Sequence, residues 1–173
     1  MPQHTEHALV SLARRAILHH LTTGEHLEST DELSIAWQTP AGVFVSLTRH
    51  GELRGCIGTC VATRLSLIQE IIQNAVAAAT ADPRFPPITR DDMGEIDISV
   101  DVLASPEKVE GMDQLDPKRY GVIVRANGRG GVLLPDIAQV TTAEGQVAIA
   151  RRKAGIGPDE RVEIYRFEVT RYH

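Results

Sequence analysis

Residues 43–59 read V-F-V-S-L-T-R-H-G-E-L-R-G-C-I-G-T. Every second residue from Val43 to Leu47 is aliphatic, which is the period of a β-strand with one buried face. Gly51 supplies the left-handed backbone conformation that a tight turn requires. The chain then returns through a second strand over about 53–59. This stretch therefore predicts an antiparallel β-hairpin.

The returning strand carries a thiol close to an arginine. Because successive side chains of a strand point to opposite faces, Arg54 and Cys56 should share the face opposite to the apolar one. Two such neighbours lie roughly 7 Å apart, close enough for an arginine to stabilise a thiolate. Gly55 and Gly58 would let another backbone or a ligand approach closely. Cys56 is therefore a candidate nucleophile, with Arg54 as its electrostatic support.

A structural role for both cysteines stays open, because cysteine is among the residue types most often buried as a small apolar side chain. Cys56 and Cys60 have only His50 near them in sequence, so no metal site is predicted. Asp82 and Arg84 belong to the stretch A-D-P-R-F-P-P. They are either part of the site or a turn with its own ion pair.

Periodicity along the rest of the chain predicts three helices and further strands. Helices are expected over about 6–21, over 65–79, and from a capping box of Thr141 and Glu144 to Ala154. Strands are expected over about 96–102, 120–125, 132–134 and 162–169, with N-G-R-G-G as a turn. A hairpin followed by a helix thus occurs twice, and R-G-C-I at 54–57 is echoed by R-G-G-V at 129–132. This order indicates an α+β fold with antiparallel pairing.

Composition narrows the classes of partner. The chain has 173 residues, of which 42% are hydrophobic and 24% charged, with a formal net charge of -5 and no run of five basic residues. Nucleic acid and anionic membranes are therefore not expected as partners. The sequence shows no signal-peptide pattern and no apolar run long enough for a membrane span, so a cytoplasmic location is expected. The length suits one domain, or two tightly packed lobes over about 1–105 and 106–173.

The stretch G-E-L-R-G-C-I-G-T resembles the signature of the AMMECR family, whose prokaryotic members are known as AmmeMemoRadiSam system protein A. The similarity continues, in the family's order, through F-V-S-L-T-R-H-G, A-V-A-A-A-T-A-D-P-R-F-P-P, I-D-I-S-V-D-V-L-A-S-P-E, Y-G-V-I-V, L-L-P and K-A-G-I. The resemblance implies a single AMMECR-type domain over 1–173. Its fold would be α+β, with a barrel-like, mostly antiparallel sheet made from two related hairpin-plus-helix halves and flanked by helices. The site residues that it implies are Arg54, Gly55, Cys56, Ile57 and Gly58, followed by Asp82, Arg84, Phe85 and Pro86.

Two functions stay open. In the first, the protein is an enzyme or a catalytic accessory that acts on a small anionic metabolite. Cys56 would be the nucleophile, Arg54 the anion anchor and His50 or Asp82 the proton carrier, while the ligand-binding residues would be Gly55, Gly58, Arg84 and Phe85. In the second, a non-catalytic binding or regulatory protein docks a partner through the same surface. The resemblance implies a Memo-type protein and a radical-SAM protein as partners, and no cofactor follows from the sequence.

Overall fold

The computed structural model describes residues 5–29 and 35–173. The chain forms two compact units. The first runs to Val102 and takes up Thr170–His173 again at the C-terminus, and the second is Leu103–Val169. The last strand therefore belongs to the first unit, whereas a division at 105/106 would place it in the second.

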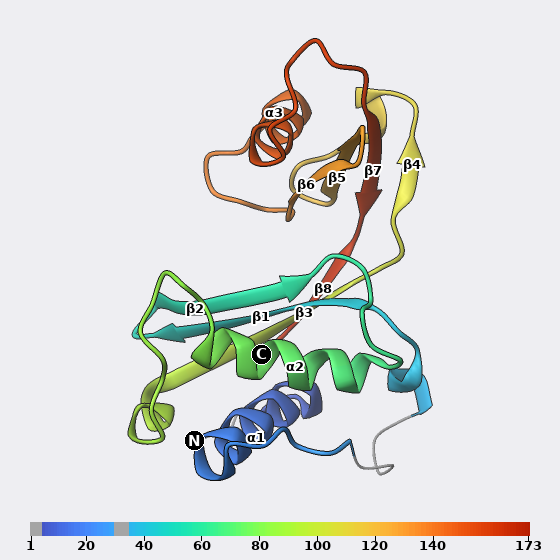
Figure 1. The fold of residues 1–173 in the computed structure, drawn as a ribbon. Coiled ribbons are helices and arrows are strands. Elements are labelled where there is room, and N and C mark those ends of the chain that lie inside the picture. The colour runs from blue at the N-terminus through green and yellow to red at the C-terminus, as the bar shows by residue number, and fades with distance from the viewer. Residues whose placement is uncertain (1–4, 30–34) are drawn as a thin grey trace. The chain divides into compact units, whose positions relative to one another are not determined.

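The first unit packs two helices against one face of a four-stranded sheet (Figure 1). Its helices are α1 (Ala8–Thr23) and α2 (Leu67–Thr80), with short 3-10 helices η1 (Ile35–Gln38) and η2 (Asp91–Glu95). Its strands are β1 (Gly42–Arg49), β2 (Glu52–Thr59), β3 (Ile96–Leu103) and β8 (Val169–Tyr172), in the order β2-β1-β3-β8. Helix α2 packs on β1 and β2, and α1 packs on α2. The buried aliphatic side chains of β1 and β3 meet both helices in one core.

The second unit is smaller and has a single α-helix, α3 (Ala143–Lys153). Its strands are β4 (Glu107–Val109), β5 (Gly121–Ala126), β6 (Arg129–Leu133) and β7 (Glu163–Phe167), in the order β4-β7-β5-β6, with the 3-10 helix η3 (Met112–Gln114). Helix α3 packs on β5 and β6 and closes a separate core. Within the described ranges, no helix is long and apolar enough to cross a membrane.

The α+β class and the antiparallel pairing are confirmed, but the barrel-like sheet is wrong. The strands form two separate four-stranded sheets, each with two edge strands: β2 and β8 in one, β4 and β6 in the other. A barrel pairs its first strand with its last, so that no edge remains. Neither sheet closes in this way.

Both units repeat one arrangement of a hairpin, a helix and a third strand that pairs with the first strand of the hairpin. The result is β2-β1-β3 in one sheet and β6-β5-β7 in the other. Both hairpins also turn on two residues with left-handed backbone. These are His50 and Gly51, with φ of 52° and 82°, and Asn127 and Gly128, with φ of 49° and 76°. The predicted repetition of hairpin and helix is therefore present as a repeated topology.

A glycine in each edge strand allows the helix to approach closely. A Cβ atom on Gly55 would lie 2.2 Å from the carbonyl oxygen of Ala78 in α2. A Cβ atom on Gly131 would lie 2.0 Å from the carbonyl oxygen of Ala150 in α3. Any side chain at these two positions would collide with helix backbone, which cannot rotate away.

The register of the two hairpins differs by one bulged residue. In the first, Thr48 pairs with Leu53 but the preceding Leu47 pairs with Gly55, so Arg54 is an extra residue at a β-bulge. In the second, the pairing runs without interruption through Gly131. Gly55 therefore corresponds to Gly131, and the echo between R-G-C-I and R-G-G-V is displaced by one residue. Arg54 has no counterpart in the second unit.

Three details of the predicted elements are wrong. Helix α3 is capped by Thr142, whose Oγ1 accepts from the Gly145 amide at 3.1 Å, and not by Thr141. The single strand expected over 162–169 is split between β7 and β8, which belong to different sheets. Strand β4 (Glu107–Val109) lies between the strands expected over 96–102 and 120–125, where no strand was predicted.

Replacing Gly55 with alanine should lower the free energy of unfolding by about 1–3 kcal/mol, the usual cost of forcing a methyl group into packed space. Gly131→Ala should do the same, because its Cβ would meet a helix carbonyl in the same way. Urea unfolding followed by circular dichroism measures both. Gly94→Ala is the control, since a Cβ there has no neighbour within 4 Å. Wild-type stability in Gly55→Ala would contradict the close approach.

Candidate functional site

Cys56 lies on β2, at the edge of the first sheet. It pairs with Ser46 of β1, whose hydroxyl donates a hydrogen bond to the Cys56 thiol, with 3.3 Å between Oγ and Sγ. Its neighbours Gly55 and Ile57 face α2 and the core. The thiol thus points away from the helices, as the alternation of the strand predicts. Neither Cys56 nor Cys60 forms a disulfide.

Two side chains from the loop after α2 form hydrogen bonds with the backbone amide and carbonyl groups of Cys56 at the open edge of the sheet. The Cys56 amide donates to Oδ2 of Asp82 at 2.9 Å. Nη2 of Arg84 donates to the Cys56 carbonyl oxygen at 3.3 Å. An edge strand leaves such groups unpaired unless something covers them. Asp82 and Arg84 therefore replace a neighbouring strand at this one residue.

Asp82 is a buried, ionised carboxylate. Its side chain is only 2% exposed and forms an ion pair with Arg84, with 2.8 Å between Oδ2 and Nη2. Oδ1 also accepts from the backbone amide and from Nε of Arg84, at 3.1 and 3.0 Å. Hydrogen bonding to Arg84, above all, holds the pKa of Asp82 well below its usual range despite burial, and the same contact raises the pKa of Arg84. With both oxygens occupied by donors, Asp82 is suited to hold Cys56 in place rather than to carry a proton.

Arg54 points toward the loop. Its Nη1 donates to the carbonyl oxygen of Pro86 at 3.2 Å. Strand alternation alone would place Arg54 on the same face as the Cys56 thiol, but the bulge at Arg54 breaks that alternation. The arginine that bonds to Cys56 is Arg84, through the backbone carbonyl. Its guanidinium also lies 5.4 Å from the centroid of the Phe85 ring.

The remaining predicted residues serve other contacts. His50 lies in the hairpin turn with its side chain 76% exposed, and its Nε2 is 3.5 Å from a carboxylate oxygen of Glu95. Gly58 is covered by the Phe44 ring, which a Cβ atom would meet at 2.2 Å. Gly55 is covered by α2. The structure thus brings Cys56, Arg54, Asp82, Arg84 and Phe85 to one edge, and places His50 at the turn.

The second unit provides an internal comparison for this edge. Val132 follows Gly131 as Cys56 follows Gly55, and its carbonyl oxygen accepts from Nζ of Lys153 at 2.8 Å, much as Cys56 accepts from Arg84. The helix carbonyl groups that lie against the two glycines belong to Ala78 and Ala150. Four residues after Ala78 comes Asp82, whereas four residues after Ala150 comes Ala154.

The cation at the strand edge is therefore common to both units and belongs to the fold. The thiol of Cys56, the carboxylate of Asp82 and the bulged Arg54 distinguish the first unit. The architecture that the two units share does not require these three residues. Across residues 5–29 and 35–173, no three His, Cys, Asp or Glu side chains are grouped so as to hold a metal ion.

These features define an α+β protein of two hairpin-and-helix units, in which side chains close the sheet edge of the first. The AMMECR1 family model matches residues 10–172, and the chain belongs to this family. A Thermotoga maritima protein is 48% identical over an alignment of 170 residues that covers 96% of this chain and 98% of that protein.

Two further comparisons agree with this membership. A Clostridium acetobutylicum protein is 44% identical over 168 residues, covering 94% of this chain, but the chain spans only 35% of that protein. The crystal structure of an uncharacterised protein from Pyrococcus horikoshii matches with a TM-score of 0.84 at 34% sequence identity, over 94% of this chain and 88% of the other.

Acid should reveal the role of Asp82. Because its pKa is lowered on folding, its contribution to stability is complete above the unfolded value of about 4 and is lost as the pH falls below that value. Asp82→Asn should therefore lower the free energy of unfolding by about 1–3 kcal/mol at pH 7, and this deficit should shrink below about pH 4. Urea unfolding at pH 7, 5, 4 and 3 measures it.

The matched control is Asp97→Asn, which removes the same charge from an exposed position on β3. It should change stability little at any of these pH values. Equal pH profiles for the two variants would contradict the account of Asp82.

Proposed function

We propose that the protein is a binding protein that docks a partner protein through the edge of the first hairpin. The edge surface consists of Leu53, Arg54, Arg84 and Phe85, around Cys56. The observation that carries the proposal is the reciprocal bonding of its two arginines. Arg54 on the strand donates to a loop carbonyl, and Arg84 on the loop donates to a strand carbonyl.

Such fixed arginines suit an interface because less side-chain freedom is lost on binding. The side chain of Arg84 remains 56% exposed although Asp82 holds it, and Leu53 is 41% exposed. Arginine and aromatic residues are enriched among the residues that dominate binding energy. The edge surface combines both kinds, with an aliphatic side chain beside them.

The charge of the edge surface indicates the chemistry of the partner. The carboxylate of Asp82 is buried and neutralises Arg84, whose guanidinium still faces the solvent, so together with Arg54 the edge surface carries one net positive charge on a chain whose formal net charge is -5. A partner with an acidic patch would complement this surface.

Family membership supplies the partners to test. The family resemblance points to a Memo-type protein and a radical-SAM protein. In the Clostridium acetobutylicum relative the matched region makes up 35% of the protein, so there this domain is joined to further polypeptide. The occurrence of this domain both alone and joined to other sequence is compatible with a function in a complex with other proteins.

The docking proposal predicts measurable binding to the Memo-type or the radical-SAM protein of the same organism, by biolayer interferometry. Arg54→Ala should weaken that binding by tenfold or more, because arginines at the centre of interfaces contribute strongly. Arg15→Ala, which removes one exposed arginine from α1, is the charge-matched control and should leave binding unchanged. No binding by the wild-type protein, or equal binding by the two variants, would contradict the proposal.

Thiol chemistry is the second candidate, and the Ser46 hydroxyl favours it. A hydrogen bond from Ser46 to the sulfur at 3.3 Å would stabilise a thiolate, and Arg84 beside it would attract an anionic metabolite. It ranks second because both proton carriers foreseen from the sequence have other tasks. Asp82 is saturated with donors, and His50 lies in the turn beside Glu95.

Alkylation by iodoacetamide separates the two candidates. In a Cys60→Ser background, thiol chemistry predicts rapid modification of Cys56 at pH 7 that slows several-fold when Ser46 is replaced by alanine, because the thiolate loses its donor. Docking alone predicts slow modification that does not depend on Ser46. Mass spectrometry of the modified peptide measures both rates. Fast, Ser46-dependent modification without any partner binding would favour the enzyme.

A further inference from the structure

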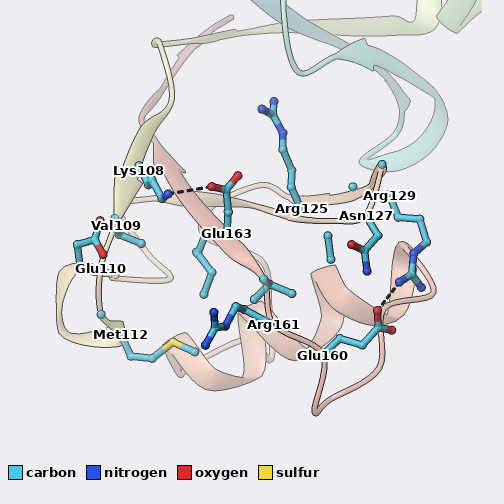
Figure 2. A pocket seen from close by; sticks show the side chains of 16 residues that line it. Lys108, Val109, Glu110, Met112, Arg125, Asn127, Arg129, Glu160, Arg161 and Glu163 are labelled. Atoms are coloured by element: carbon cyan, nitrogen blue, oxygen red, sulfur yellow. Dashed lines mark hydrogen bonds and ion pairs between the residues drawn. The ribbon is translucent and has the colours of Figure 1, made fainter.

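The second unit contains an open cavity that the site residues foreseen from the sequence do not touch. Its volume is about 1090 Å³, and it is lined by β4 and the residues after it, by the β5–β6 turn, and by the start of β7 (Figure 2). Typical small-molecule sites enclose about 300–1,000 Å³. The cavity is therefore large enough for a metabolite-sized ligand.

The cavity collects positive charge on an acidic protein. Four cationic and three anionic side chains line it, whereas the whole chain has a formal net charge of -5. Two of the cations are matched by ion pairs, drawn as dashed lines in Figure 2: Lys108 with Glu163 at 2.8 Å, and Arg129 with Glu160. A concave surface with an excess of one charge concentrates ligands of the opposite charge.

The other two cations, Arg125 and Arg161, form no ion pair with a carboxylate of the described residues. Arg125 lies over the Tyr165 ring, with 5.0 Å between the guanidinium carbon and the ring centroid. Arg161 makes no hydrogen bond or ion pair with any residue of the described ranges. A guanidinium without a partner in a cavity is able to bind a carboxylate or a phosphate with two parallel hydrogen bonds.

The same cavity also offers apolar surface. Met112, Val162 and Ile164 line it, and Met112 is 37% exposed. Methionine adapts readily to the shape of a bound apolar group. A purely inorganic anion would leave this surface unused.

We propose that the cavity of the second unit binds a small organic anion, with its carboxylate or phosphate group on Arg161 and its apolar body against Met112 and Val162. This site is separate from the edge surface of the first unit and does not depend on the docking proposal. Its positive charge and its unpaired guanidinium select the anionic head group of the ligand, and its apolar wall selects the apolar body.

An NMR titration of the full chain with phenyl phosphate and with benzoate tests the site. The expected result is saturable shifts, with at least one of the two, in the backbone amides of 108–112, 125–130 and 160–164. The probe that binds more tightly shows whether the site prefers a phosphate or a carboxylate. Inorganic phosphate and benzyl alcohol, which each carry one half of the ligand, should bind at least tenfold more weakly. Sodium chloride at equal ionic strength should produce no saturable shift.

Variants assign the binding to named residues. Arg161→Ala should weaken binding at least tenfold, and Met112→Ala should weaken binding of phenyl phosphate more than that of inorganic phosphate. Arg152→Ala is the charge-matched control, because Arg152 is an exposed residue of α3 outside the lining. Arg54→Ala, which tests the edge surface of the first unit, should not change the binding of either probe to the cavity. Failure of the cavity proposal and failure of the docking proposal can therefore be told apart. No saturable shift with either probe, shifts outside these segments, or equal effects of Arg161→Ala and Arg152→Ala would overturn the proposal.

Discussion

The contact between a helix carbonyl and a glycine of the edge strand determines much of what surrounds the site. Because the Ala78 carbonyl occupies the space where a Cβ of Gly55 would lie, α2 lies directly on the hairpin, and the chain that leaves the helix passes along the β2 edge. Asp82 and Arg84 then reach the backbone of the next residue, Cys56. The second unit repeats the contact through Gly131, and Lys153 reaches the strand edge in the same manner. One packing constraint thus accounts for both side-chain contacts at a strand edge.

Those parts of the fold that depend on local periodicity could be predicted from the sequence. The alternation in β1, the left-handed turn at Gly51 and the apolar side of α2 each follow from neighbours along the chain. Strand β4 was missed because three residues with two exposed side chains carry no periodic signal. The split between β7 and β8 depends on which sheet each segment joins, and sheet closure depends on contacts between distant strands. Neither leaves a local pattern.

The candidate site could be predicted only in part for the same reason. Asp82 and Arg84 were proposed either as site residues or as a turn with an ion pair, and the structure shows that the pair exists and also holds Cys56. The side chain that contacts the thiol is that of Ser46 rather than Arg54, because a β-bulge shifts the register of the hairpin by one residue. No residue type in the sequence indicates this bulge. The cavity of the second unit was missed altogether, since its lining comes from separate segments that look ordinary one by one.

The two units share the packing of a helix carbonyl on a strand glycine, but among the described residues only in the first does a carboxylate, that of Asp82, bind the edge of the hairpin. Hydrogen exchange of two backbone amides tests this difference most directly. The Cys56 amide should exchange slowly at neutral pH because Asp82 accepts it, and this protection should vanish in Asp82→Ala. The Val132 amide occupies the corresponding place beside Ala154, and no side chain described in the second unit accepts from it, so it should exchange fast. Equally fast exchange of Cys56 and Val132 in the wild-type protein would contradict the account.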